Sequence, residues 1–93
     1  MGTDRNEPGK FLNLRLCDIG TEFVSRAEAK RLLSDVESFN EITLDFARVA
    51  WVGQGFVDEV FRVWAKGHRG ISLRPINMNE AVEFMVNRGF PRD

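Results

Sequence analysis

Apolar and polar residues alternate along three short stretches of the chain, at residues 10–16, 42–46 and 71–76. A period of two is typical of a β-strand with one buried and one exposed face, so each stretch is predicted to form a strand. The first alternation is imperfect, because Leu12 interrupts it. Pro75 in the third has no amide donor, which confines it to the end of a strand or to an edge strand.

Between these stretches, apolar residues recur three and four positions apart, which predicts helices. The first helix is expected to begin at Ser25 and to run to about residue 38, because Ser25 and Glu28 have the spacing of a capping box. The second follows Gly55, and the third follows the capping spacing that begins at Asn77. The predicted order is therefore β-α-β-α-β-α.

Regular alternation of strands and helices predicts an α/β domain with a small, mostly parallel or mixed sheet of three to four strands. A fourth strand would come from residues 21–24 or from another subunit, so a homodimer stays open. Residues 1–9 are polar and contain Gly and Pro, which predicts a flexible N-terminal tail. Residues 10–93 are predicted to form one domain.

Composition narrows the range of partners. The formal net charge is −1 and basic residues are scattered among acidic ones, so neither nucleic acid nor an anionic membrane is expected as a partner. The single Cys17 cannot form an internal disulfide, which is typical of a reducing compartment. With no signal-peptide pattern and no long apolar run, a cytoplasmic location is expected.

The segment Gly53-Gln54-Gly55 leads into the second helix and has two interpretations. Free backbone donors and the helix dipole at such a start favour anions, and glycines let a ligand approach closely, which would give a small-ligand or nucleotide-binding sensor. Asp58 and Glu59 in the first turn would repel the same anion. A simple tight turn is the alternative.

Arg26, Asp45 and Asn77 are candidates for a ligand contact or a structural motif. Asp45 ends a strand, where open α/β sheets place ligands, although an Asp in this position also binds backbone donors of the following loop. Arg26 lies in the first turn of its helix, where the dipole disfavours a cation. A pairing with Asp58 or Glu59 would explain it, and a free surface arginine is equally consistent.

Catalysis is not expected. His68 lies in a turn without a second histidine, Cys17 is expected to be a small buried residue, and the motifs assemble no nucleophile, base and orienting group. The pattern therefore predicts no enzyme, no cofactor and no metal site. Trp64 falls on an apolar helix stripe and is assigned to the core, whereas Trp51 precedes the Gly-rich segment and fits either the core or an interface.

Several short motifs occur in a specific order along the chain. They are Ser25-Arg26 at a helix start, Asp45-Phe46 at a strand end, Phe56-Val57-Asp58-Glu59 in the next helix, and Pro75-Ile76-Asn77 before the last helix. This order resembles a family of STAS-like domains of unknown function, related to the STAS domains of anti-sigma-factor antagonists. The resemblance extends over roughly residues 20–88.

The resemblance implies helices mainly on one face of the sheet and a partner surface at the start of the central helix. In the antagonists, an ATPase-type kinase phosphorylates a serine there, which releases the partner. Gln54 occupies the equivalent position, so this switch is not expected. The implied function is a bacterial regulatory module that binds a protein, such as a histidine-kinase-type ATPase. The predicted partner-binding residues are Trp51, Gly53, Gln54, Gly55, Asp58, Glu59 and Arg62.

Overall fold

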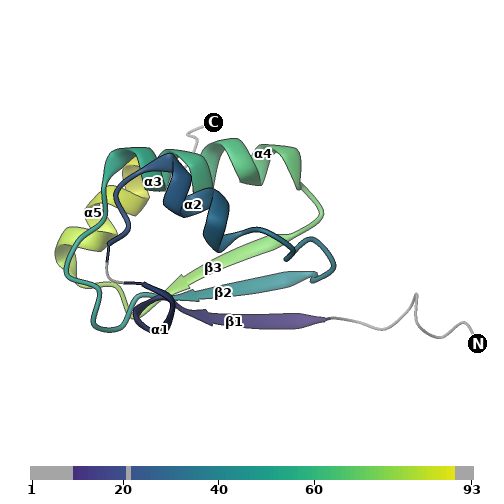
Figure 1. The fold of residues 1–93 in the computed structure, drawn as a ribbon, viewed down its shortest axis with the longest axis horizontal. Coiled ribbons are helices and arrows are strands. Elements are labelled where there is room, and N and C mark those ends of the chain that lie inside the picture. Colours follow the sequence, from purple (N-terminus) through teal and green to yellow (C-terminus); the bar gives the residue numbers. More distant parts are fainter. Residues whose placement is uncertain (1–9, 21, 90–93) are drawn as a thin grey trace, which may run out of the picture.

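A layer of helices covers one face of a three-stranded parallel sheet in the computed structural model (Figure 1). The structure describes residues 10–20 and 22–89; the predicted tail at residues 1–9 lies outside this part of the chain. In chain order the elements are β1 (Phe11–Arg15), α1 (Leu16–Ile19), α2 (Arg26–Leu32), β2 (Glu41–Asp45), α3 (Gln54–Asp58), the π-helical segment η2 (Glu59–Trp64), α4 (Ala65–Gly67), β3 (Ser72–Ile76) and α5 (Glu80–Gly89). The predicted α/β class and the alternation of strands and helices along the chain are confirmed.

The two faces of the sheet follow from the alternation in the sequence. The strands are ordered β1-β2-β3, and the register places Leu14, Leu44 and Pro75 side by side. Ile42 and Leu44 point to the helices and are fully buried. The alternate positions of the three strands are mostly polar, which lets this parallel sheet leave its other face uncovered.

Cross-strand ion pairs line the uncovered face. Arg74 lies 3.1 Å from Glu41, and Arg15 lies 3.9 Å from Asp45. The backbone register places each of these side chains on adjacent strands and on the same face of the sheet. Exposed pairs of this kind stabilise a fold only slightly, so their main effect is to keep the face soluble.

The helical layer supplies the other half of the core. Figure 1 shows α2, α3, α4 and α5 on the same side of the sheet. Their inward side chains meet those of β2 and its flanking loops in one cluster, whose largest fully buried members are Phe46, Phe56, Phe61, Leu16, Leu33, Ile42, Leu44, Val52, Val60, Val82 and Val86. Trp64 packs partly buried against this cluster and stacks on His68, with ring centroids 4.0 Å apart.

Three details differ from the sequence-based expectation. Residues 22–24 form no strand, because the carbonyls of Phe23 and Val24 accept hydrogen bonds from the start of α3 instead of from a sheet; Thr21 lies outside the described residues. The first helix ends at Leu32 rather than near residue 38, and Asp35 then takes a left-handed conformation (φ 64°). The central helix contains a π-helical segment that the spacing did not predict.

Pro75 lies on β3, an edge strand of the sheet, as its missing donor requires. Within the described residues, none of the helices has both the length and the apolar character needed to cross a bilayer.

Candidate partner-binding site

Close packing explains the glycines at the start of α3. Gly53 is the N-cap residue and has extended dihedral angles that any residue adopts (φ −95°, ψ 163°). A Cβ atom here, however, would lie 2.6 Å from the carbonyl oxygen of Val24. A Cβ atom at Gly55 would lie 3.3 Å from the same oxygen. The glycines therefore admit the backbone of residues 22–25 against the start of the central helix.

The same backbone segment uses hydrogen-bond donors at this helix start. The N–H of Gly53 donates to the carbonyl of Phe23 at 2.8 Å, and the N–H of Phe56 donates to the carbonyl of Val24 at 3.0 Å. These donors are not available to a phosphate, and the space that the glycines leave is filled by protein. The geometry therefore favours the tight-turn interpretation over a phosphate or nucleotide site.

A capping box holds the segment from its other side. The Ser25 hydroxyl accepts from the N–H of Glu28, and the Glu28 carboxylate accepts from the N–H groups of Ser25 at 2.8 Å and Val24 at 2.6 Å. Hydrogen bonds from Ser25 and Val24 lower the pKa of Glu28 below its ordinary value. The predicted capping box is confirmed, and it fixes the backbone that packs on Gly53.

Arg26 connects α2 to the central helix. Its guanidinium donates to Asp58 at 2.8 Å and to Glu59 at 3.5 Å, and Asp58 also pairs with Arg62 at 3.3 Å. The hydrogen bond and negative charge of Asp58 raise the pKa of Arg26. Glu59 is buried, with 7% of its surface exposed, so its carboxylate faces the protein rather than a partner.

We call the contacts of residues 22–26 with residues 53–59 the inner clasp. It comprises the backbone packing on Gly53, the two hydrogen bonds to α3, the Arg26 ion pairs and an edge-to-face contact of Phe23 with Phe56, whose ring centroids are 5.4 Å apart. Asp58 and Glu59, predicted as partner contacts, and Gly53 and Gly55 thus have structural roles in this clasp. At Gly53, a Cβ atom would collide with the Val24 backbone.

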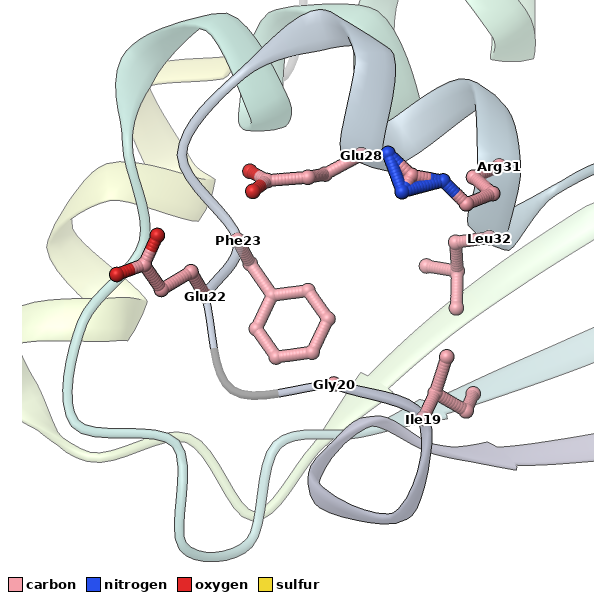
Figure 2. Close-up of a pocket in the computed structure, with 7 residues that line it drawn as sticks. All are labelled: Ile19, Gly20, Glu22, Phe23, Glu28, Arg31 and Leu32. Atoms are coloured by element: carbon pink, nitrogen blue, oxygen red, sulfur yellow. The ribbon is translucent and has the colours of Figure 1, made fainter.

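A small pocket lies beside the inner clasp and has a volume of about 260 Å³. Figure 2 shows the Phe23 ring pointing into the space bounded by Ile19 and Leu32, with Glu28 and Arg31 on the helix above it. The Glu28 carboxylate is directed toward the backbone that it caps. Because this carboxylate already accepts backbone hydrogen bonds, we assign no ligand to the pocket.

Asp45 joins the ends of two strands. Its carboxylate accepts from the N–H of Ala47 at 3.0 Å and from the side-chain amide of Asn77 at 2.9 Å. The hydrogen bond from Asn77, followed by that from Ala47, lowers the pKa of Asp45. Asn77 itself is left-handed (φ 58°), a conformation that Asn tolerates well. Both candidates therefore hold the ends of β2 and β3 in place.

Trp51 and Gln54 belong to the same Gly-rich segment and are exposed. Together with Val52, Gly53 and α5 they form an open groove of about 750 Å³, which we call the outer groove; its lining residues are Trp51, Val52, Gly53, Gln54, Glu80, Ala81, Phe84 and Met85. Trp51 is 58% exposed and Phe84 is 60% exposed. The question left open for Trp51 is thus decided against the core.

Asn79 fixes the shape of the outer groove. Its side-chain amide donates to the carbonyls of Val49 at 3.2 Å and Ala50 at 2.9 Å, and its oxygen accepts from the N–H of Val82 at 2.8 Å. The residue thereby caps α5 and ties the loop before Trp51 to the start of that helix. The groove is built on two elements with a defined relative position, as a preformed binding surface requires.

Phe84 and Asn79 were missed by the sequence analysis. Val82 and Val86 form the buried apolar stripe of α5, and Phe84 lies outside this stripe. An aromatic residue on the polar side of a helix is the sequence signal that would have identified Phe84. The capping role of Asn79 has a local signal, an Asn directly before a helix, but its contacts with carbonyls about thirty residues away have none. No cluster of three or more potential metal ligands occurs among the residues that the structure describes.

The fold and this site define a small α/β domain with helices on one face of a parallel sheet and a structured start to the central helix. A family model described as STAS-like domain of unknown function (DUF4325) matches residues 28–83. The chain belongs to this family, as the order of its short motifs suggested. No curated protein and no solved structure shows a significant match.

Proposed function

We propose that this domain is a regulatory protein-interaction module that binds its partner through the outer groove. The observation that carries the proposal is the exposure of Trp51 and Phe84, at 58% and 60%, on either side of one apolar hollow. Single exposed apolar residues are common on soluble proteins, but aromatic residues grouped around a hollow are typical of protein contacts. A partner side chain that enters the groove would remove both rings from water.

Gln54 lies on the rim of this groove and supports a binding mode without phosphorylation. The side chain is exposed at the start of α3, at the position that corresponds to the phosphorylated serine of the anti-sigma-factor antagonists. It donates and accepts hydrogen bonds but has no hydroxyl group to modify. Control would therefore come from the partner or from protein concentration. By its similarity to these antagonists, a histidine-kinase-type ATPase in the bacterial cytoplasm is the first partner to test.

A binding role agrees better with the geometry than a catalytic role or a nucleotide sensor. The charged residues nearest the Gly-rich segment, Arg26, Asp58 and Glu59, bind one another. The backbone donors of Gly53 and Phe56 bind the carbonyls of residues 23 and 24. These groups are therefore engaged in the fold, whereas the apolar surface of the outer groove is available.

The experiment compares three baits: the wild-type domain, Phe84→Asp and Phe11→Asp. Phe11 is 68% exposed on β1 and does not line the outer groove. The control therefore introduces the same charge at a similarly exposed aromatic residue outside the groove. Proteins retained from a lysate of the native organism are identified, and a retained ATPase is then purified and titrated against each bait. We expect the wild-type protein and Phe11→Asp to bind it and Phe84→Asp to lose binding. Equal binding by all three baits would remove the outer groove as the partner surface.

A further inference from the structure

Within the part of the chain that the structure describes, no strand pairs with the outer edge of β3. The N–H of Ser72 donates to Asn40 and the carbonyl of Ile76 accepts from Phe46, both at 2.9 Å, so these residues point toward β2. Successive residues of a strand direct their backbone groups to opposite sides. Leu73 therefore directs its N–H and carbonyl away from the sheet, and Pro75 directs its carbonyl the same way. Such an edge is a template for another strand.

A groove of about 610 Å³ runs between this edge and α4. It is lined by Phe61, Arg62, Ala65, Lys66, Arg69, Ile71 and Leu73. Its apolar floor includes Leu73 and Ile71, which pack partly buried against the core, while cationic side chains form its rim. Figure 1 shows α4 and the start of β3 at the end of the molecule away from α5, so this surface is separate from the outer groove.

The positive charge of the groove is largely uncompensated. Arg62 is paired with Asp58 at 3.3 Å. Lys66 and Arg69 are exposed, and within the described part of the chain neither forms an ion pair. A ligand strand with acidic residues near these side chains would be attracted by their positive charge, whereas a basic strand would be repelled.

The same charges disfavour a second copy of this chain as the occupant. A symmetric dimer through β3 would bring Lys66 and Arg69 of both copies to one interface. Within the described residues the other edge of the sheet is β1, which is preceded by Lys10, a residue that forms no ion pair there. Pairing β1 with β3 of another copy would add this charge to those of Lys66 and Arg69. Charged edges of this kind prevent edge-to-edge association of identical sheets.

We propose that the β3 edge binds an extended, acidic peptide segment of another protein as an added strand. Backbone hydrogen bonds form to Leu73 and Pro75, aliphatic side chains at alternate positions fill the groove over Leu73, and acidic residues at the ends of the segment contact Lys66 and Arg69. Pro75, which lacks a donor, limits the length of the added ladder. This surface shares no residue with the outer groove and goes beyond the function proposed above.

Hydrogen exchange at the Leu73 amide tests the backbone contact. The probe is the peptide Glu-Glu-Val-Thr-Val-Thr-Glu-Glu, and its control replaces every Glu with Lys. With about nine-tenths of the protein bound, exchange at Leu73 should slow roughly tenfold with the acidic peptide and stay unchanged with the basic one. The proposal fails if millimolar acidic peptide gives no slowing, or if both peptides slow exchange equally. It also fails if exchange of the free protein slows as its own concentration rises, which would identify a second copy as the occupant.

Charge reversal tests the rim. In Lys66→Glu with Arg69→Glu, affinity for the acidic peptide at about 0.15 M salt should fall by roughly tenfold or more. The matched control, Lys30→Glu with Arg31→Glu, makes the same change in net charge on the exposed side of α2 and should keep wild-type affinity. Equal losses in the two double variants would show attraction by net charge alone and overturn the proposed site. Phe84→Asp should bind the peptide normally, which separates this test from that of the outer groove.

Discussion

The two sides of the Gly-rich segment at residues 51–55 differ in what their side chains contact. On the inner side, Gly53 packs on the backbone of Val24 and the neighbouring Arg26 binds Asp58. On the outer side, Trp51 is 58% exposed and borders a hollow shared with α5. The groups on the inner side bind one another within the fold, whereas the outer side has exposed apolar surface that a partner could contact.

The residues of the family motifs are therefore different from the residues proposed to bind the partner. Ser25-Arg26 and the Asp58-Glu59 pair are parts of the motif order that resembles STAS-like domains, and the structure shows them joining α2 to the central helix. The motif is therefore restricted by packing and ion pairing. Trp51 and Phe84, which form the outer groove, lie outside those motifs.

Gly53→Ala should cause the largest loss of stability and tests whether the inner side is as closely packed as the geometry indicates. Its Cβ atom would meet the Val24 carbonyl at 2.6 Å, and backbone on both sides must shift. We expect the free energy of unfolding to fall by about 2–3 kcal/mol in a urea titration. Gly67→Ala is the control, since nothing lies within 4 Å of its Cβ and it lies in a helix. It should stabilise by about 0.5–1 kcal/mol. Equal effects in the two variants would contradict the clasp.

Arg26→Glu is expected to have the next largest effect, because it places a third carboxylate beside Asp58 and the buried Glu59. The midpoint of urea unfolding should decrease clearly and should recover in part when Asp58→Arg is added. Lys30→Glu, on the exposed side of α2, serves as the control and should leave the midpoint close to that of the wild-type protein. A midpoint unchanged in Arg26→Glu would show that the ion pairs add nothing to the inner side.

Lowering the pH should decrease the free energy of unfolding, because protonation of Glu28 weakens its hydrogen bonds in the capping box. Its pKa in the folded protein lies below the ordinary value of 4.5, so its contribution to stability is present above that value and is lost as the pH falls through the folded pKa. Glu28→Gln keeps an oxygen acceptor but removes the charge. The variant should be less stable than wild type at pH 7, and in urea titrations the difference should shrink as the pH falls below 4.5 and through the lowered pKa of Glu28. A difference that is constant over this range would show that the capping box does not depend on charge.

The sequence predicts the fold well where local periodicity decides it. Alternation located all the strands, and the capping box at Ser25 located the start of α2. The early end of α2 was not predicted, because buried residues continue at helical spacing through Leu33 and Val36. The π-helical segment was not predicted either. The inner clasp was partly predicted, since a pairing of Arg26 with Asp58 or Glu59 was one of two interpretations of an arginine in the first turn of a helix, and the structure shows this pairing.

The outer groove was harder to predict because its halves are far apart in the sequence. Trp51 and Phe84 line one groove because α5 packs against α3 and the core, and because Asn79 binds the carbonyls of Val49 and Ala50. Local patterns contain no information about such a contact. Asp58 and Glu59 were assigned to the partner surface because charged residues on a helix are usually exposed. Their ion pairs with Arg26 on α2 could not be seen from the sequence of the central helix alone.

Phe84→Ser should cause the smallest change in stability. It tests whether the outer groove is a binding surface rather than part of the core. The ring is 60% exposed, and among the described residues it lies against the Arg88 guanidinium, 5.6 Å from the ring centroid. Such a cation–π contact contributes about 0.5 kcal/mol at an exposed site, so the free energy of unfolding should change by no more than about that amount. The same variant should lose the partner that the wild-type domain retains. A loss of stability near 2 kcal/mol would instead place Phe84 in the core, and the outer groove would then be a packing feature rather than a binding surface.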